Sequence, residues 1–410
     1  MAPISAQNTA PGELHLPSWL RASAEARGRA EMESFRITKQ DQSIFGALTR
    51  FRLNTQVSAA TWLRFVVVVQ DSRTLAGPSE ALAPDNHLDI LHGFTELGHG
   101  DEGPWRLRIG RQPLAFGDER LIGSDSFWCN NSQRFDSVRG TVRHGLWQVD
   151  LFTASPIDII RDRVDPIRTS DLLSGIYGSW SKQASTVEPY MLWKRSRPRR
   201  MEPNLGDRYD LLTPGARVSL SVGYGFQAVT EVALQRGRVG AKPVTAWAGY
   251  WELSRRFGAD ESAPRVALSY SQASGDANGS DGRVGTFNDL NPAAYNGCGF
   301  FEPFSWRNIR DLRIATEWSL PAKWKLTAEL HHYWLATVND GVYVDEGPYV
   351  AYDPMAPSSR LGARALARVQ RDFGAHLELG IGYARFFPSA YLKSGMSLHN
   401  SAFISWTMRT

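Results

Sequence analysis

The sequence predicts an all-β protein, a single antiparallel up-and-down β-barrel of about 18 strands that crosses a membrane. Apolar and polar residues alternate over long stretches, which is the period of a strand whose two faces meet different surroundings. The longest purely aliphatic or aromatic run is 65–69, whereas a spanning helix needs ~20 apolar residues. The chain also has 14 Trp, 13 Tyr and 19 Phe, enough for the aromatic girdles of a barrel. A soluble β-rich protein is the alternative.

Residues 19–32 form the clearest strand. Small or apolar residues occupy the even positions from Leu20 to Met32, and most odd positions are polar or charged, among them Arg21, Arg27 and Arg29. The alternation is longer than the roughly five or six residues of an ordinary strand, and a barrel strand in a membrane needs ~9–11 residues plus overhang. The segment therefore indicates a spanning strand with its arginines on the inner face.

The same alternation recurs along the chain, so we expect a polar N-terminal segment at 1–16 and a barrel at 17–410. Further strands are expected at 43–56, 61–70, 87–97, 104–112, 133–143, 146–155, 173–182, 185–195, 210–222, 225–237, 243–256, 263–273, 308–319, 323–336, 358–371, 374–386 and 399–409. Long outer loops are expected near 113–132, 195–209 and 274–306, where turn-forming residues interrupt the alternation.

Arginine dominates the predicted inner face. Lysine supplies only 7 of the 46 basic residues, and the other 39 are arginines against 42 acids, for a net charge of +4. Because the arginines are spread along the whole chain, they do not form the cluster typical of a nucleic-acid binder. The inner arginines are expected to be Arg21, Arg27, Arg29, Arg50, Arg52, Arg64, Arg108, Arg139, Arg143, Arg217, Arg265, Arg313, Arg360, Arg364 and Arg368, opposed by fewer carboxylates that include Glu96, Glu231 and Glu317.

This surplus predicts an anion-selective pore. A guanidinium group is always charged and binds a carboxylate through two parallel hydrogen bonds, and conduction requires that such attraction stay weak and distributed. Any one arginine is more often a partner in a cross-strand ladder with carboxylates, so the prediction depends on the collective excess. A polymer with one carboxylate per sugar suits this surface. Passive uptake of small anionic solutes is an alternative, and an outer-membrane hydrolase is a second.

Several short motifs carry a resemblance to a known family. GRQ at 110–112, GDERLIG at 117–123 and RFDSVR at 134–139 resemble the signature of the alginate-export porins of Gram-negative outer membranes. The resemblance implies a barrel of ~18 strands with an electropositive constriction, used to export alginate or other anionic substrates. The positions that match are Arg108, Gly110, Arg111, Gln112, Gly117, Asp118, Arg120, Gly123, Arg134, Phe135, Asp136 and Arg139.

The expected location is the outer membrane, although residues 1–12 lack the basic and apolar segments of a signal peptide. We expect a start Met placed on a mature sequence. The expected partners are membrane lipid, lipopolysaccharide and an anionic saccharide or small anion, with no nucleic acid, and we expect a monomer. No hydrolase or nucleotide-binding motif occurs, so neither an enzyme nor a cofactor is expected.

Two loop features leave alternatives open. Cys129 and Cys298 both fall in expected loops, where they form one disulfide or remain two unpaired thiols. Polar residues at 276, 278 and 280 have the offsets of a calcium loop, but Phe287 occupies the position of the bidentate Glu. A Gly-rich surface loop is therefore expected, with adventitious calcium as the alternative and no metal site.

Overall fold

The computed structural model consists almost wholly of β-strands. It describes residues 16–37, 40–77, 85–100, 103–124, 129–197, 208–260, 262–292, 303–343, 358–389, 392 and 397–410. The strands are β1 (Leu20–Ile37), β2 (Gln40–Ala60), β3 (Leu63–Ala76), β4 (Asn86–Gly98), β5 (Trp105–Gln112), β6 (Phe135–His144), β7 (Trp147–Pro156), β8 (Asp171–Lys182), β9 (Ser185–Ser196), β10 (Tyr209–Gly223), β11 (Phe226–Val239), β12 (Lys242–Arg256), β13 (Arg265–Ala273), β14 (Ile309–Leu320), β15 (Trp324–Leu335), β16 (Arg360–Phe373), β17 (Leu377–Pro388) and β18 (Ser397–Arg409). Among these residues no helix is both long and apolar enough to cross a membrane.

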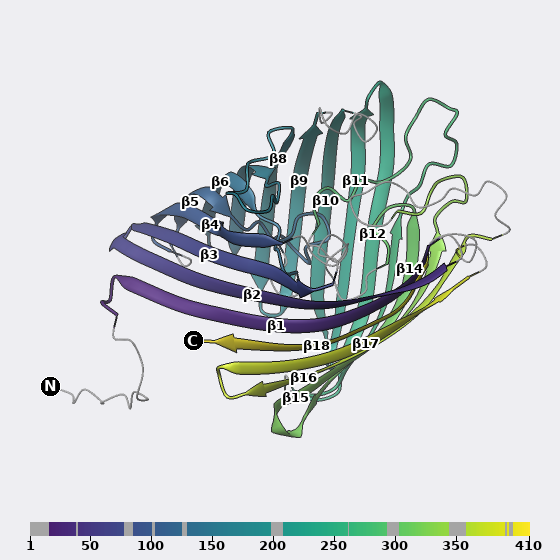
Figure 1. Cartoon of the computed structure of the whole chain (residues 1–410). Coiled ribbons are helices and arrows are strands. Elements are labelled where there is room, and N and C mark those ends of the chain that lie inside the picture. Colours follow the sequence, from purple (N-terminus) through teal and green to yellow (C-terminus); the bar gives the residue numbers. More distant parts are fainter. Residues whose placement is uncertain are drawn as a thin grey trace.

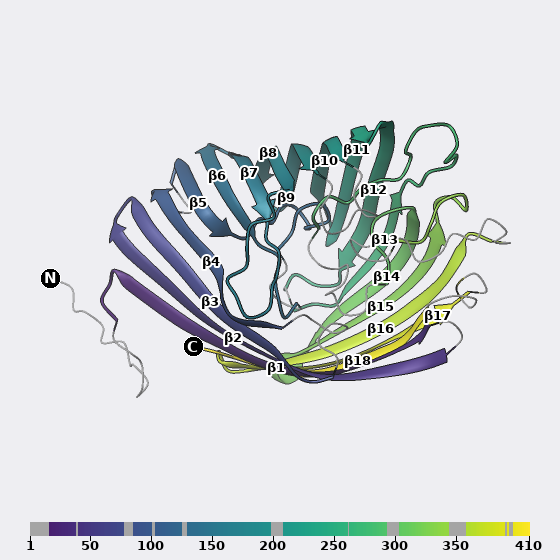
Figure 2. The same ribbon diagram turned by 45° about the horizontal axis from the view of Figure 1, so that its top comes forward.

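The strands close into one barrel. Each strand pairs antiparallel with the next along the chain, and β1 pairs antiparallel with β18, with Gly28 opposite Trp406. Figures 1 and 2 show the resulting ring of tilted strands. Closure leaves no free edge among the described strands, so each strand is paired on both sides. The predicted antiparallel barrel of about 18 strands is confirmed.

The two-residue alternation separates the faces of the wall. On β11, Val232 and Leu234 are exposed, while Glu231, Ala233 and Gln235 between them are buried. Because the buried set faces the interior of the ring, the exposed apolar set forms the outer surface, as expected for a wall in lipid. Outward-facing rings also gather near the short turns, as Trp62, Trp105 and Trp147 do.

The two ends of the barrel differ in their connections. At one end the strands are joined by short turns such as 61–62, 145–146 and 183–184, and the start of β1 and the C-terminus lie there (Figure 1). At the other end the connections include 113–134, 157–170 and 274–308. In outer-membrane barrels short turns face the periplasm and long loops face outward, which orients the chain.

The loops carry apolar residues into the barrel. Phe116, from the connection between β5 and β6, stacks on Phe152 at 5.0 Å and on Tyr177 at 4.7 Å between ring centroids. From the connection between β13 and β14, Phe287 packs against Trp306 with centroids 5.6 Å apart. Figure 2 shows connecting segments inside the ring of strands. The interior is therefore partly filled by a hydrophobic cluster, a feature that the polar inner face expected from sequence did not include.

Candidate pore and its constriction

Residues 117–120, from the connection between β5 and β6, are fixed to one side of the lumen. Gly117 has a φ of +56°, and a Cβ there would crowd Tyr177 and Arg217, so glycine suits this turn. Asp118 then bridges two arginines: one carboxylate oxygen lies 2.7 Å from Arg217 and the other 2.9 Å from Arg120. The acidic residue of the motif therefore ties the loop to the wall at β10.

Arg120 extends this attachment to β11 and β12. Its guanidinium carbon lies 3.5 Å from the centre of the Tyr250 ring, which is a cation–π contact. A guanidinium nitrogen of Arg120 also lies 4.0 Å from a carboxylate oxygen of Glu231, which is buried and accepts a hydrogen bond from Tyr190 at 3.1 Å. Glu231, on the wall at β11, thus offsets the charge of Arg120 in the loop. Burial raises the pKa of Asp118, but Arg120 and Arg217 outweigh this effect and lower it.

Residues 129–132 of the same connection lie against the opposite wall. Arg50 donates to the Cys129 carbonyl at 2.6 Å, and Arg27 donates to Asn130 at 3.0 Å. Arg52 donates to Ser132 at 2.8 Å. These arginines belong to β1 and β2, nine strands away from β10 and β11 around the ring. The described residues of this connection thus touch both sides of the lumen and narrow it, and we name residues 113–124 and 129–134 the constriction loop.

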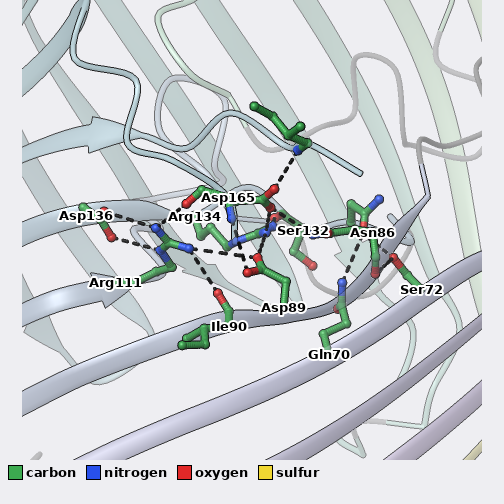
Figure 3. A network of polar contacts seen from close by, with 12 residues as sticks. Gln70, Ser72, Asn86, Asp89, Ile90, Arg111, Ser132, Arg134, Asp136 and Asp165 are labelled. Atoms are coloured by element: carbon green, nitrogen blue, oxygen red, sulfur yellow. Dashed lines mark hydrogen bonds and ion pairs between the residues drawn. The ribbon is translucent and has the colours of Figure 1, made fainter. Parts of the chain in front are cut away.

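A buried ion cluster holds the base of the constriction loop (Figure 3). Arg134 is 2.8 Å from Asp89 of β4 and is also paired with Asp165 of the connection between β7 and β8. Arg111 binds both carboxylate oxygens of Asp136, at 3.0 and 3.3 Å, and donates to the Asp165 carbonyl at 2.8 Å. The motif residues 111, 134 and 136 therefore join two loops to β4 and β5.

Asp165 makes this cluster sensitive to pH. Burial, together with the neighbouring Asp89 carboxylate, raises the pKa of Asp165 to about 6, against ~3.9 for an unperturbed Asp. Between these values the folded chain binds more protons than the unfolded chain, so the contribution of Asp165 to the free energy of unfolding falls as pH rises. We expect Asp165→Asn, which resembles the protonated acid, to match the parent near pH 4 and to be more stable at pH 7. Urea unfolding of both proteins at the two pH values measures this. If the free energies of unfolding of the two proteins differed equally at both pH values, the raised pKa of Asp165 would be contradicted.

Most of the predicted inner arginines form cross-strand ladders. Glu96 binds Arg108 at 2.6 Å and pairs with Arg64, and Asp150 binds Arg139 at 2.8 Å. The remaining ladder contacts join Arg143 to Gln148, Arg217 to Glu188, Arg265 to Glu252 and Glu317, Arg313 to Glu329, and Arg364 to Glu329. Such contacts fix side-chain positions, and those with carboxylates also cancel charge locally.

One large cavity in the lumen has a nearly balanced charge. It has a volume of about 1010 Å³ and lies between the constriction loop and the wall from β10 to β17. Its basic lining residues are Arg120, Arg217, Arg265, Arg313, Lys325 and Arg368, and its acidic ones are Asp118, Glu119, Glu252, Asp311, Glu317, Glu329, Asp372 and Glu378. This part of the lumen carries no arginine excess.

The smaller cavity is strongly basic. It has a volume of about 240 Å³ and lies against β1, β2 and β16–β18. Two carboxylates line it, Glu25 and Glu378. The six arginines that line it are Arg27, Arg29, Arg50, Arg52, Arg368 and Arg409. Because Arg368 and Glu378 line both cavities, the two spaces adjoin at β16 and β17. We name this set of six the arginine cluster.

Arg360 lies elsewhere than the sequence suggested. A register shift makes Leu361 an extra residue between Gly362, opposite Tyr333, and Arg360, opposite Trp334. Leu361 is fully buried in the inner hydrophobic cluster and Arg360 is exposed, so the bulge turns Arg360 outward. This position corrects the expected inner placement. Arg21 is exposed near the short-turn end.

The other motif positions support the local backbone. Gly110 pairs with Phe94 on β4, and buried Gln112 donates to the Ser137 carbonyl at 3.2 Å. The Gly123 amide donates to the Asn291 carbonyl at 3.0 Å, which joins the constriction loop to the connection between β13 and β14. Sequence reasoning did not single out Asp89, Asp165, Glu188 or Glu252 as partners, although the alternation of β9 and β12 places Glu188 and Glu252 inward.

The residues with calcium-like offsets hydrogen-bond within the protein. Asp276 accepts a hydrogen bond from the Asn278 amide, and its own amide donates to Asp340 at 2.8 Å. Phe287 is buried in the hydrophobic cluster. Within the described part of the chain, no group of three or more acidic, His or Cys residues could hold a metal. Cys129 is buried, and Cys298 lies outside the described residues, so the disulfide stays a prediction.

Comparisons with known proteins agree with this architecture. The model of the family described as "Alginate export" matches residues 18–402. No curated protein sequence matches significantly. Among solved structures, OccK3 (OpdO) of Pseudomonas aeruginosa is 13% identical, with 95% of each chain covered and a TM-score of 0.62. OccK2 (OpdF) of the same organism is 11% identical, with 95% and 98% covered and a TM-score of 0.64. OccAB3 of Acinetobacter baumannii is 12% identical, with 95% and 99% covered and a TM-score of 0.62.

Proposed function

The chain belongs to the alginate export family, and we propose that its pore selects anions and conducts or exports an anionic, uronate-type polysaccharide similar to alginate. The family and the barrel make it an outer-membrane porin of a Gram-negative bacterium rather than an enzyme, in contact with lipid. The proposal concerns what passes through the pore. The arginine cluster is the observation that carries it, because six guanidinium groups and two carboxylates line one small cavity.

The contacts of the cluster suit reversible binding of carboxylates. Arg27, Arg50 and Arg52 donate to an amide, a carbonyl and a hydroxyl oxygen of the constriction loop, which are uncharged acceptors. Arg50 is also paired with the Glu25 carboxylate at 2.5 Å. Charge-assisted hydrogen bonds to carboxylates are roughly twice as strong as neutral ones, so a uronate carboxylate can compete for these donors. Neighbouring arginines then offer the next position, and exchange between them keeps each step weak enough for release.

Passive uptake of small anionic solutes is the second candidate. The constriction loop is bound to both sides of the lumen through Asp118 and through residues 129–132. A segment held at both ends leaves less room for a wide polymer than an open barrel does. This observation favours small anions, whereas the family favours a polysaccharide. We also propose that the barrel is a monomer and that it contacts lipopolysaccharide in the outer leaflet.

Single-channel recording in planar bilayers tests the proposal. Under a KCl gradient the reversal potential should have the sign of Cl⁻ preference. Uronate oligomers should block the current at lower concentration than the monouronate if the pore takes a polysaccharide. Equal block by the monouronate and by small aromatic acids would support uptake of small anions instead. A cation-selective reversal potential would contradict both candidates.

A further inference from the structure

Three arginines face outward, away from the lumen, at the long-loop end of neighbouring strands. Arg195 on β9 shares the outer face with Met191 and Trp193, which are exposed. Arg236 and Arg238 on β11 continue the outer face of Val232 and Leu234 and are exposed as well. We name Arg195, Arg236 and Arg238 the outer arginine patch. Because these side chains leave the wall on the lipid side, a solute in the pore does not meet them.

Strand β10 lies between the members of the patch. In the register of the sheet, Asp210 is opposite Arg195 on one side and Arg238 on the other, and Leu212 is opposite Arg236. Residues directly opposite in an antiparallel pair have Cα atoms about 4.5 to 5.5 Å apart. The three guanidinium groups therefore emerge within one small area of the outer surface.

The carboxylate of Asp210 alone does not neutralise the three arginines of the patch. Asp210 accepts a hydrogen bond from the Trp193 indole at 2.7 Å and lies 3.7 Å from Arg195. Arg236 donates to the carbonyl of its neighbour Gln235 at 3.0 Å. Within the described ranges, neither Arg236 nor Arg238 has an ion-pair partner. Like charges this close repel one another, so an external anion would stabilise the patch.

The patch lies at the level of lipid headgroups. Arg195 follows Trp193 by two residues and Arg236 follows Leu234 by two residues, a rise of roughly 7 Å along a strand. Trp rings mark the boundary between hydrocarbon and headgroups in barrels. The arginines thus begin where the apolar band ends, at the outward-facing end of the barrel.

We propose that the outer arginine patch binds a phosphate of the phosphorylated sugar headgroup of lipopolysaccharide, with acyl chains along Met191, Leu212 and Leu234. Guanidinium groups match phosphate geometry through paired hydrogen bonds, and an anionic surface attracts each arginine near it. The proposal rests on the outer-membrane location and outward long loops, but it is independent of what the pore conducts.

Arg73 on β3 provides a matched control. It also faces outward near the long-loop end, since it continues the outer face of Phe65 and Val67. Unlike the patch, it is neutralised by Asp71, whose two carboxylate oxygens accept hydrogen bonds at 2.7 and 2.8 Å. A headgroup phosphate would have to displace this carboxylate, so Arg73 is not expected to contribute.

Native mass spectrometry of the whole folded chain tests the proposal. Diphosphoryl lipid A is added to the parent, to Arg236→Gln/Arg238→Gln and to Arg73→Gln. Arg236→Gln/Arg238→Gln should retain at least roughly tenfold less lipid A than the parent. Arg73→Gln should retain as much as the parent. Phosphatidylglycerol at the same concentration should not displace lipid A. Equal retention by the double variant, or equal displacement by phosphatidylglycerol, would overturn the proposal.

A second measurement separates this outcome from misfolding and from the proposed pore function. The mobility shift of the unheated barrel in gel electrophoresis should be the same for all three proteins, and so should the reversal potential in planar bilayers. If Arg236→Gln/Arg238→Gln fails to fold, the single variant Arg238→Gln takes its place, with a smaller loss expected. Normal currents combined with unchanged lipid retention would refute the lipid site and leave the pore proposal intact.

Discussion

Replacing Arg27 and Arg368 with glutamate should abolish the anion preference of the channel. The double change leaves four arginines and four glutamates around the small cavity, where the parent has six and two. Opposite unit charges about 4 Å apart attract by about 1 kcal/mol even at the dielectric constant of water. Two charge reversals should therefore lower the anion-to-cation permeability ratio by roughly tenfold.

Reversal potentials under a KCl gradient measure this effect, which should weaken as salt screens the charges. Arg255→Glu is the matched control, because Arg255 faces outward over Phe226 at 4.9 Å and over Phe257 at 5.0 Å. The control should keep the parent's reversal potential. An unchanged potential in Arg27→Glu/Arg368→Glu would show that the arginine cluster does not set selectivity.

Leu330→Arg should destabilise the barrel in lipid strongly. Leu330 faces outward on β15, is 59% exposed, and is flanked by Ile314 and Ala365 on the neighbouring strands. An arginine on the lipid face costs about 2–4 kcal/mol near the bilayer midplane. Urea unfolding in phospholipid vesicles, followed by tryptophan fluorescence, measures the loss in the free energy of unfolding.

Thr327→Arg serves as the control on the same strand. Thr327 lines the larger cavity, opposite Glu317 on β14 and Arg368 on β16. An arginine placed there remains in water, where attraction to Glu317 offsets repulsion from Arg368, so the free energy of unfolding should stay close to that of the parent. Equal losses for the two variants would show that position 330 does not face hydrocarbon.

Much of the wall could be predicted because period-two alternation is a local property. Residues 19–32 and 225–237 show which face is apolar without any knowledge of their neighbours, and closure then follows from the lack of water in lipid. A bulge breaks this logic. At Leu361 one extra residue exchanges the faces of the strand, and nothing in the two-residue alternation around Arg360 signals the change.

The constriction could not be predicted in the same way. Arg50 meets the Cys129 carbonyl 79 residues away, and Arg52 meets Ser132 80 residues away. Such contacts depend on how a loop folds back into the barrel, which no periodicity encodes. The resemblance to the alginate-export family identified Asp118, Arg120 and Arg134 as motif residues. Their interaction partners are apparent only in the folded structure. The local excess of arginines at β1 and β2 likewise depends on which inner arginines have carboxylate partners on the neighbouring strands.

The two attachments of the constriction loop have a mechanical consequence. An empty cylinder of β-sheet deforms most easily by flattening into an ellipse, since this bends the hydrogen-bonded ladders only slightly. Here Asp118 holds β10 and residues 129–132 hold β1 and β2, strands at opposite ends of a diameter. The loop acts as a strut, so lateral pressure from the bilayer is resisted by ion pairs and hydrogen bonds across the hollow as well as by the sheet itself.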